Sequence, residues 1–286
     1  FTLVGLPDTS LAESRDRVRA AVTSSGLAWP NRRITVNLSP ATLPKSGSVF
    51  DVAIAVATLA GAGVVPVEAV AEVVHLGELG LDGRLRPVRG VLPAVAAAVA
   101  AGRPRVVVPS ANLAEAQLVP GAQVRGADCL AEVVAHYGAD VEVPAPSMAR
   151  GAVAVVPAGA HPLDLADVVG QADARRSLEV AAAGGHHLLM VGPPGAGKTM
   201  LAARLPGLLP DLDEREAVEV TAVHSVAGTF DPQQGLLRRP PFEDPHHTAT
   251  PASIVGGGSG LPRPGAASRA HRGVLFLDDS KDDATH

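Results

Sequence analysis

One glycine-rich segment constrains this chain more than any other feature. Residues 192–199 read Gly-Pro-Pro-Gly-Ala-Gly-Lys-Thr, which fits the pattern G-x-x-x-x-G-K-[ST] without departure. The apolar run Leu188–Val191 before it predicts a short strand, and residues 200–205 after it suit a helix. Glycines allow backbone N–H groups to converge on phosphate oxygens, and the N-terminus of the following helix adds partial positive charge. The sequence therefore predicts a phosphate-binding P-loop rather than a chance glycine turn.

This loop predicts the contacts of a bound nucleotide. We expect Lys198 to neutralise the β- and γ-phosphates of ATP and the hydroxyl of Thr199 to ligate Mg²⁺. The nucleotide-binding residues expected from the motif are Gly192, Pro193, Pro194, Gly195, Ala196, Gly197, Lys198, Thr199 and Met200.

A second apolar run supplies the carboxylates that such a site needs. Residues 274–277 are Val-Leu-Phe-Leu and lead directly into Asp278 and Asp279. We expect Asp278 to hold Mg²⁺, directly or through water, and Asp279 to polarise the attacking water. Taken alone, this pattern also fits a buried strand that ends in an acidic turn. Its pairing with the upstream loop favours the catalytic interpretation, with Lys198, Asp278 and Asp279 as catalytic residues.

The length of 286 residues suggests about two domains at ~150 residues each. A stretch rich in proline and glycine predicts a linker over residues 144–163. Before it, residues 1–143 mix helical and strand-like patterns, typical of an α+β or α/β domain. They include a Ser10-to-Glu13 capping box and a hairpin of residues 73–76 with 84–88 around Gly80–Gly83. Residues 164–286 form the second predicted domain.

Composition excludes several classes of protein. The chain carries 24 Lys and Arg against 29 Asp and Glu, so a globally basic nucleic-acid-binding protein is excluded, although a local basic patch is not. The single cysteine, Cys129, excludes an internal disulfide and suggests a reducing compartment. No apolar run approaches the ~20 residues of a membrane span, so we expect a cytoplasmic protein without membrane contact. Because the chain begins at Phe1 inside a strand-like run, we expect a fragment.

Further stretches carry a resemblance to a known family. They are Leu3–Pro7, Arg15–Arg19, Ile34–Leu38, Leu43–Lys45, Leu76–Leu79, Asp167–Gln171, Ala182–His186, residues 192–199, Pro245–Thr248, Val255–Gly258 and His271–Asp278. In this order they resemble the YifB/ComM family of magnesium-chelatase-like AAA+ ATPases, over nearly the whole chain up to Asp278.

The resemblance implies an α/β chain in two parts. The first is a Lon-protease-like (ribosomal S5 domain 2-like) α+β domain over residues 1–143, clipped at its N-terminus, and the second a partial AAA+ domain over residues 164–286. It also implies that Val169 and Gly170 lie near adenine, that subunits form a homo-oligomer, often a hexameric ring, and that ATP hydrolysis drives DNA processing such as branch migration. Because the family's arginine finger and sensor residues lie beyond this chain, we expect it to hydrolyse ATP weakly.

Three other functions remain alternatives. A magnesium-chelatase motor subunit has a similar AAA+ module but lacks the Lon-like domain. A Lon-type peptidase needs a serine activated by a lysine, whereas alignment by eye places Val49 and Leu92 at those positions. The third alternative is a non-functional gene fragment, because residues 280–286 depart from the family's continuation.

Residues 228–268 are rich in glycine and proline and form a candidate DNA-contacting segment. Its arginines could contact DNA phosphates, but arginines are equally common in a solvated loop. These residues are Arg238, Arg239, Arg263 and Arg269. His246 and His247, with His224 and His271, lack the spacing of a zinc site, so we interpret them as turn residues.

Overall fold

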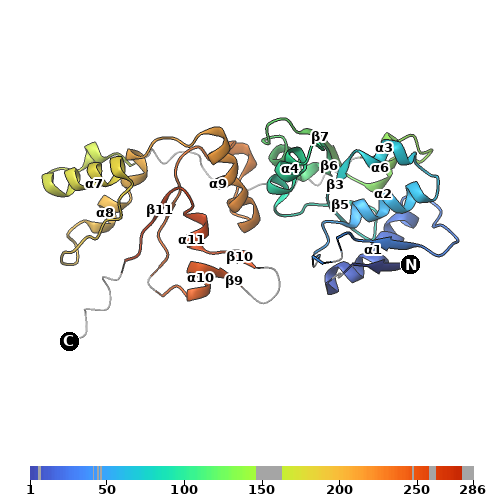
Figure 1. Cartoon of the computed structure of the whole chain (residues 1–286), viewed down its shortest axis with the longest axis horizontal. Helices are drawn as coiled ribbons and strands as arrows, with labels where there is room; N and C mark the ends of the chain where they lie inside the picture. Colours follow the sequence, from blue (N-terminus) through green and yellow to red (C-terminus); the bar gives the residue numbers. More distant parts are fainter. Residues whose placement is uncertain are drawn as a thin grey trace. The chain divides into compact units, whose positions relative to one another are not determined.

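The computed structural model describes residues 1–5, 8–40, 42–43, 45, 47–145, 163–246, 248–257 and 262–278 (Figure 1). The chain divides into two compact units, residues 1–150 with 231–235 and residues 151–230 with 236–286. Each unit combines helices with short strands, which confirms the α/β class. Asp279 and most of the predicted linker lie outside the described residues.

Unit 1, the N-terminal unit, alternates strands and helices. Its elements are β1 (Thr2–Val4), α1 (Thr9–Ser24), β2 (Thr35–Asn37), α2 (Asp51–Gly61), α3 (Val67–Ala71), β3 (Val74–His75), β4 (Glu78–Leu79), β5 (Leu85–Arg86), α4 (Val91–Ala100), β6 (Arg105–Pro109), η1 (Ser110–Asn112), α5 (Leu113–Ala116), β7 (Gln123–Ala127) and α6 (Leu130–His136). Strands β3, β6 and β7 form a parallel sheet in the order β3-β6-β7. Strands β1 and β2 pair in parallel, and β4 and β5 pair antiparallel.

The core of unit 1 is built from small aliphatic side chains of α1, α2, α6 and the strands beside them. Leu11, Val18 and Val22 of α1 are fully buried. They pack with Leu59 of α2 and Leu130 of α6 in one cluster. Of the aromatic side chains, Tyr137 is buried in this cluster, while Phe1 and Trp29 pack against it with their ring centroids 5.3 Å apart in an edge-to-face contact.

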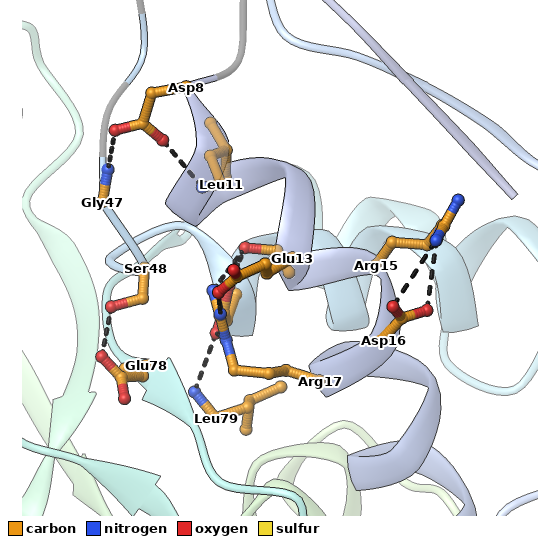
Figure 2. A network of polar contacts seen from close by, with 12 residues as sticks. Asp8, Leu11, Glu13, Arg15, Asp16, Arg17, Gly47, Ser48, Glu78 and Leu79 are labelled. Atoms are coloured by element: carbon orange, nitrogen blue, oxygen red, sulfur yellow. Dashed lines mark hydrogen bonds and ion pairs between the residues drawn. The ribbon is translucent and has the colours of Figure 1, made fainter.

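Two charged networks hold the helices of unit 1 in place (Figure 2). The carboxylate of Asp51 is completely buried and accepts from Arg17 Nε at 2.7 Å, from the Ser14 hydroxyl and from the Leu79 N–H at 3.2 Å. Asp8 accepts from the Leu11 N–H at 2.7 Å and from the Gly47 N–H at 3.1 Å.

Two predictions for unit 1 are wrong in detail. The N-cap of α1 is Asp8 rather than Ser10, because the helix begins at Thr9 and the Asp8 carboxylate satisfies the free Leu11 N–H. The predicted hairpin is also shorter: β4 pairs with β5, whereas residues 74–75 pair in parallel with β6. Parallel pairing joins segments that are distant in sequence, so local turn signals could not reveal it.

Unit 2, the C-terminal unit, has longer helices at its start and short elements after them. They are η2 (Leu165–Asp167), α7 (Ala172–Gly184), α8 (Lys198–Ala202), η3 (Leu205–Leu208), α9 (Glu214–Ala227), β8 (Phe242–Glu243), α10 (Pro251–Val255), β9 (Gly256–Gly257), β10 (Arg263–Pro264), α11 (Ala266–Arg269) and β11 (Val274–Leu275). The intervening η4 (Pro232–Gln234) is grouped with unit 1. Strands β8 and β11 pair in parallel, and β9 and β10 pair antiparallel.

The predicted strand Leu188–Val191 is not formed. The segment is irregular, and the side chains of Leu189 and Val191 are 88% and 89% exposed. None of the strands among the described residues pairs with it, so its backbone lacks the hydrogen bonds that would make it a strand. The buried residues of unit 2 form separate small clusters, one of them around Leu178 and Leu201.

No helix within the described ranges is long and apolar enough to cross a membrane.

Candidate functional site

The glycine-rich loop lies between the irregular segment 186–191 and helix α8, which begins at Lys198. Gly195 and Gly197 have φ values of +80° and +86°, a left-handed conformation that side chains with a Cβ rarely adopt. A Cβ on Gly197 would also come within 3.1 Å of the Gln171 amide and 3.2 Å of the Met200 side chain. The loop is therefore held in a shape that requires glycine at these two positions.

Lys198 folds back over this loop. Its Nζ donates to the carbonyl oxygens of Gly192 at 2.8 Å and Pro193 at 3.3 Å. A second bond inside the loop joins the Ala196 N–H to the Pro193 carbonyl at 3.1 Å. The ammonium group thus lies against the turn whose N–H groups were predicted to receive phosphate.

The predicted metal ligands come together. The Thr199 hydroxyl, in the first turn of α8, donates to Oδ2 of Asp278 at 3.3 Å. Asp278 follows β11, and the Phe276 N–H extends that pairing by donating to the Glu243 carbonyl of β8 at 2.9 Å. Hydroxyl and carboxylate oxygens are the hard ligands that Mg²⁺ prefers, usually with waters and substrate phosphates completing its shell. These two residues fit that ion.

Metal cages made of protein ligands alone are absent among the described residues, which contain no group of three or more His, Cys, Asp or Glu side chains that could hold an ion.

Gln171 is a site residue that sequence reasoning missed. It precedes α7 with φ of +52°, an uncommon conformation for a residue with a side chain, and its Nε2 donates to the Ala196 carbonyl at 3.3 Å. It also lines a pocket of about 290 Å³ between α7, residues 188–191 and Lys198. In the sequence it appeared only as the last residue of the matching stretch Asp167–Gln171, with no role assigned to it.

The residues expected near adenine lie just before α7. Val169 is 95% exposed, and Gly170 has φ of +76°. Neither lines the pocket beside Gln171, although both adjoin that residue in the chain.

Comparisons with known proteins identify the family of the chain. The family model described as magnesium chelatase, subunit ChlI, matches residues 164–284, and the model described as subunit ChlI of Mg-chelatase matches residues 1–112. An uncharacterized protein of Mycobacterium tuberculosis is 56% identical over 284 residues, which are 97% of this chain and 54% of that protein. The uncharacterized protein YifB of Escherichia coli is 44% identical and the competence protein ComM of Haemophilus influenzae 42%, each over 98% of this chain and 54% of the relative.

The chain belongs to the YifB/ComM magnesium-chelatase-like family. It spans about half the length of these relatives. A shorter similarity, 34% identity over 132 residues, links 42% of the chain to Lon protease 2 of Bacillus subtilis.

In this YifB/ComM-type chain, ion pairs join the elements around β11, the strand that Asp278 follows. Arg269 binds Glu243 of β8 through two bonds, 2.7 Å from Nη2 and 3.0 Å from Nε, and this pairing raises the pKa of Arg269. Arg272, with φ of +57°, binds Glu216 at 2.7 Å and Glu219 at 2.9 Å on α9. The hydrogen bond with Glu219 is the largest cause of the raised pKa of Arg272.

These pairs correct one sequence-based candidate. Arg269 is engaged by Glu243 and by the Pro264 carbonyl at 3.2 Å, so it is not available for phosphate. Within the part of the chain that the structure describes, Arg238, Arg239 and Arg263 form no ion pair.

The histidines of the family motif make local contacts. His224 Nε2 lies 3.1 Å from the Arg269 carbonyl oxygen, and His246 Nδ1 lies 2.8 Å from the Thr248 hydroxyl. His271 lies 3.8 Å from Glu219. The interpretation as a turn residue is wrong for His224, which lies in the last turn of helix α9, whereas His271 lies in a turn; His247 lies outside the described residues.

The positions aligned with a Lon-type dyad contain no catalytic pair. Leu92 is fully buried and Val49 is half-buried. The nearby Ser48 hydroxyl donates to the Glu78 carboxylate, while Lys45 Nζ donates to the Pro40 carbonyl (Figure 2 shows the serine contact). No serine hydroxyl bonds to a lysine ammonium in the described ranges, in which Ser46 is not included.

Proposed function

We propose that the loop of residues 192–199 binds ATP with Mg²⁺ and that the intact YifB/ComM-type protein hydrolyses ATP to drive DNA processing. The observation that carries this proposal is the 3.3 Å hydrogen bond between the Thr199 hydroxyl and Asp278. It joins the loop to the end of an apolar strand, and this combination of hydroxyl and carboxylate is the magnesium site of P-loop ATPases.

Each residue has a distinct role in this proposal. Lys198 exchanges its two carbonyl contacts for phosphate oxygens and balances their negative charge. The backbone around Gly195 and Gly197 offers N–H groups to the phosphates. Thr199 and Asp278 hold Mg²⁺, which supplies charge neutralisation at the transferring phosphoryl group. Gln171 fixes the loop through the Ala196 carbonyl, and Asp279 polarises water.

The domain organisation is also a proposal. Unit 1 represents a Lon-protease-like, S5 domain 2-like domain of residues 1–143 that has lost proteolysis, and residues 164–286 represent part of an AAA+ domain after a linker of residues 144–163. The similarity to Lon protease 2 supports the first assignment. The P-loop and the family model over residues 164–284 support the second.

The proposed substrate class follows from one relative. ComM of Haemophilus influenzae is named a competence protein, and competence concerns the uptake of DNA. We therefore propose DNA as the partner and a homo-oligomeric, hexameric ring as the assembly that acts on it.

Nucleotide affinity tests the proposal directly. Lys198→Ala should weaken binding of a fluorescent ATP analogue by about tenfold or more, because a charge-assisted contact to phosphate contributes about 1.5–3 kcal/mol. Lys45→Ala is the matched control, since Lys45 donates only to the Pro40 carbonyl. Equal affinity in the wild type and the Lys198 variant would sink the proposed site.

The magnesium pair needs its own measurement. Asp278→Asn should reduce the gain in affinity that Mg²⁺ gives ATP, while affinity for ATP in EDTA stays unchanged. Unaltered magnesium dependence would remove Asp278 from the site.

A chelatase motor is the second candidate, favoured by the description of both matching family models as chelatase subunit ChlI. Stimulation of ATP hydrolysis in the full-length protein separates the two. DNA should stimulate it under the first proposal, and a porphyrin with Mg²⁺ under the second.

A further inference from the structure

A hollow of about 1000 Å³ lies in unit 1, and none of its lining residues belongs to the P-loop. We call it the β6–β7 hollow. It is bounded by the starts of β6 and β7, by α3 and by the end of α6. The polar side chains among its lining residues are Arg105, Gln123, Arg125, His136 and Tyr137. No carboxylate occurs among the described residues that line it.

The parallel register places both arginines on one face of the sheet. Arg105 pairs with Gln123, and Val107 pairs with Arg125. Paired residues share a face, and residues two apart along a strand also share it, so Arg105 and Arg125 point the same way. Their Cα atoms are therefore about 8 Å apart, from the usual strand spacing and rise. Two long guanidinium side chains at this separation can reach one small anion.

Both guanidinium groups are exposed and without a carboxylate partner. Neither Arg105 nor Arg125 forms an ion pair within the described ranges, in contrast to Arg17, Arg269 and Arg272 of the same chain. Uncompensated charge in a concave surface concentrates the positive potential there.

A buried hydrogen bond involves one residue that lines the hollow. Tyr137 is 9% exposed, and its hydroxyl is hydrogen-bonded to Nε2 of the buried His75 at 2.8 Å. His75 lies on β3 and pairs with Val107 of β6. The hydrogen bond between His75 and Tyr137 therefore connects the end of α6 to the sheet face that bears the two arginines.

The charges of the two arginines reach the aromatic side chains. Burial raises the pKa of Tyr137, and Arg105 and Arg125 oppose that rise. Burial also lowers the pKa of His136, and Arg125 adds to the effect. The imidazole of His136 is exposed and offers a flat surface on which a base can stack.

We propose that the β6–β7 hollow binds the phosphate group of a nucleotide or of a nucleic-acid strand, with Arg105 and Arg125 as its charged contacts. Arginine suits this ligand because its planar fork donates two parallel hydrogen bonds to phosphate oxygens. The hollow lies in unit 1, so this binding site is additional to the loop at residues 192–199.

A single fluorine label can report binding at this hollow alone. Tyr137 is the only tyrosine of the chain, so protein labelled with 3-fluorotyrosine gives one ¹⁹F resonance from the hollow. We expect this resonance to move and saturate when an oligothymidylate, AMP or inorganic phosphate is titrated. If the oligothymidylate saturates at the lowest concentration, the ligand is a strand; if AMP does, it is a free nucleotide.

The arginines provide the decisive comparison. The double variant Arg105→Ala, Arg125→Ala should weaken the best probe by about tenfold or more. Arg89→Ala, an exposed arginine outside the hollow, should stay within about twofold. Both substituted residues are exposed, and Trp29 fluorescence can verify folding. A resonance that no probe moves, or equal affinity in the double variant, would overturn the proposal.

Lys198→Ala separates this site from the P-loop. It should leave the ¹⁹F titration unchanged even where it abolishes binding of the fluorescent ATP analogue. A parallel loss of both signals would also overturn the separate site.

Discussion

Individual buried polar residues determine how the stability of unit 1 responds to pH. Burial lowers the pKa of His75 to about 4, below its ordinary value of 6.5. The unfolded chain therefore binds a proton between these values that the folded unit does not. The stability that unit 1 gains from an uncharged His75 is fully present above about pH 6.5. It is lost as the pH falls toward 4, which lowers the free energy of unfolding by up to about 3 kcal/mol.

Urea unfolding followed by Trp29 fluorescence can measure this pH effect. The midpoint of the wild type should decrease from pH 7 to pH 5, whereas His75→Gln should lack the part due to imidazole protonation. An identical pH dependence in the two proteins would contradict the assignment to His75.

Asp51 is the residue whose loss should damage unit 1 most. Its fully buried carboxylate accepts from Arg17, Ser14 and the Leu79 N–H. Asp51→Ala removes the buried carboxylate that Arg17, Ser14 and the Leu79 N–H share, so the free energy of unfolding should fall by about 3–5 kcal/mol. Asp16→Ala, in an exposed pair with Arg15, should cost less than about 1 kcal/mol in the same urea titration. Similar losses would show that the buried network is not stabilising.

At the scale of elements, helices were easier to predict than strands. Helix α7, for example, ends at the cap residue Gly185, whose left-handed conformation is a local stop signal. The segment Leu188–Val191 has the composition of a buried strand, but strands need a paired neighbour, and the described residues provide none. The same limit explains the wrong hairpin partner of residues 74–75.

Helix α9 offers a test of local encoding. The Asp213 carboxylate caps its N-terminus by accepting a hydrogen bond from the Glu216 N–H at 2.8 Å. The Glu216 carboxylate in turn accepts from the Asp213 N–H at 3.0 Å. Asp213→Ala should lower the stability of unit 2 by about 1 kcal/mol. Asp211→Ala, just outside the helix, should change it by less than about 0.5 kcal/mol. Thermal unfolding followed by far-ultraviolet circular dichroism measures both; equal effects would contradict the capping role.

The candidate site was predictable at the level of its motif. The sequence indicated that Lys198, Thr199 and Asp278 belong together, because the loop and the acidic strand end are recognisable patterns. Gln171 and the β6–β7 hollow were not predictable, since a left-handed glutamine and a strand register depend on tertiary structure.

At the scale of the whole molecule, the two units have separate cores, so a ligand of one should stabilise that one alone. Magnesium and ATP at 100 times the dissociation constant should stabilise unit 2 by about 2.7 kcal/mol. Trp29, the only tryptophan, reports unit 1. With Mg²⁺ and ATP, calorimetry should therefore show a higher unfolding temperature for unit 2, while the unfolding temperature reported by Trp29 fluorescence stays the same. Equal shifts in the two measurements would contradict independent units.

The contact between Thr199 and Asp278 also has a consequence during translation. The carboxylate is synthesised 79 residues after the hydroxyl. At ordinary rates of elongation this delay is about 4–16 s. A nascent chain on the ribosome therefore exposes the loop for seconds before the acidic partner emerges from the exit tunnel.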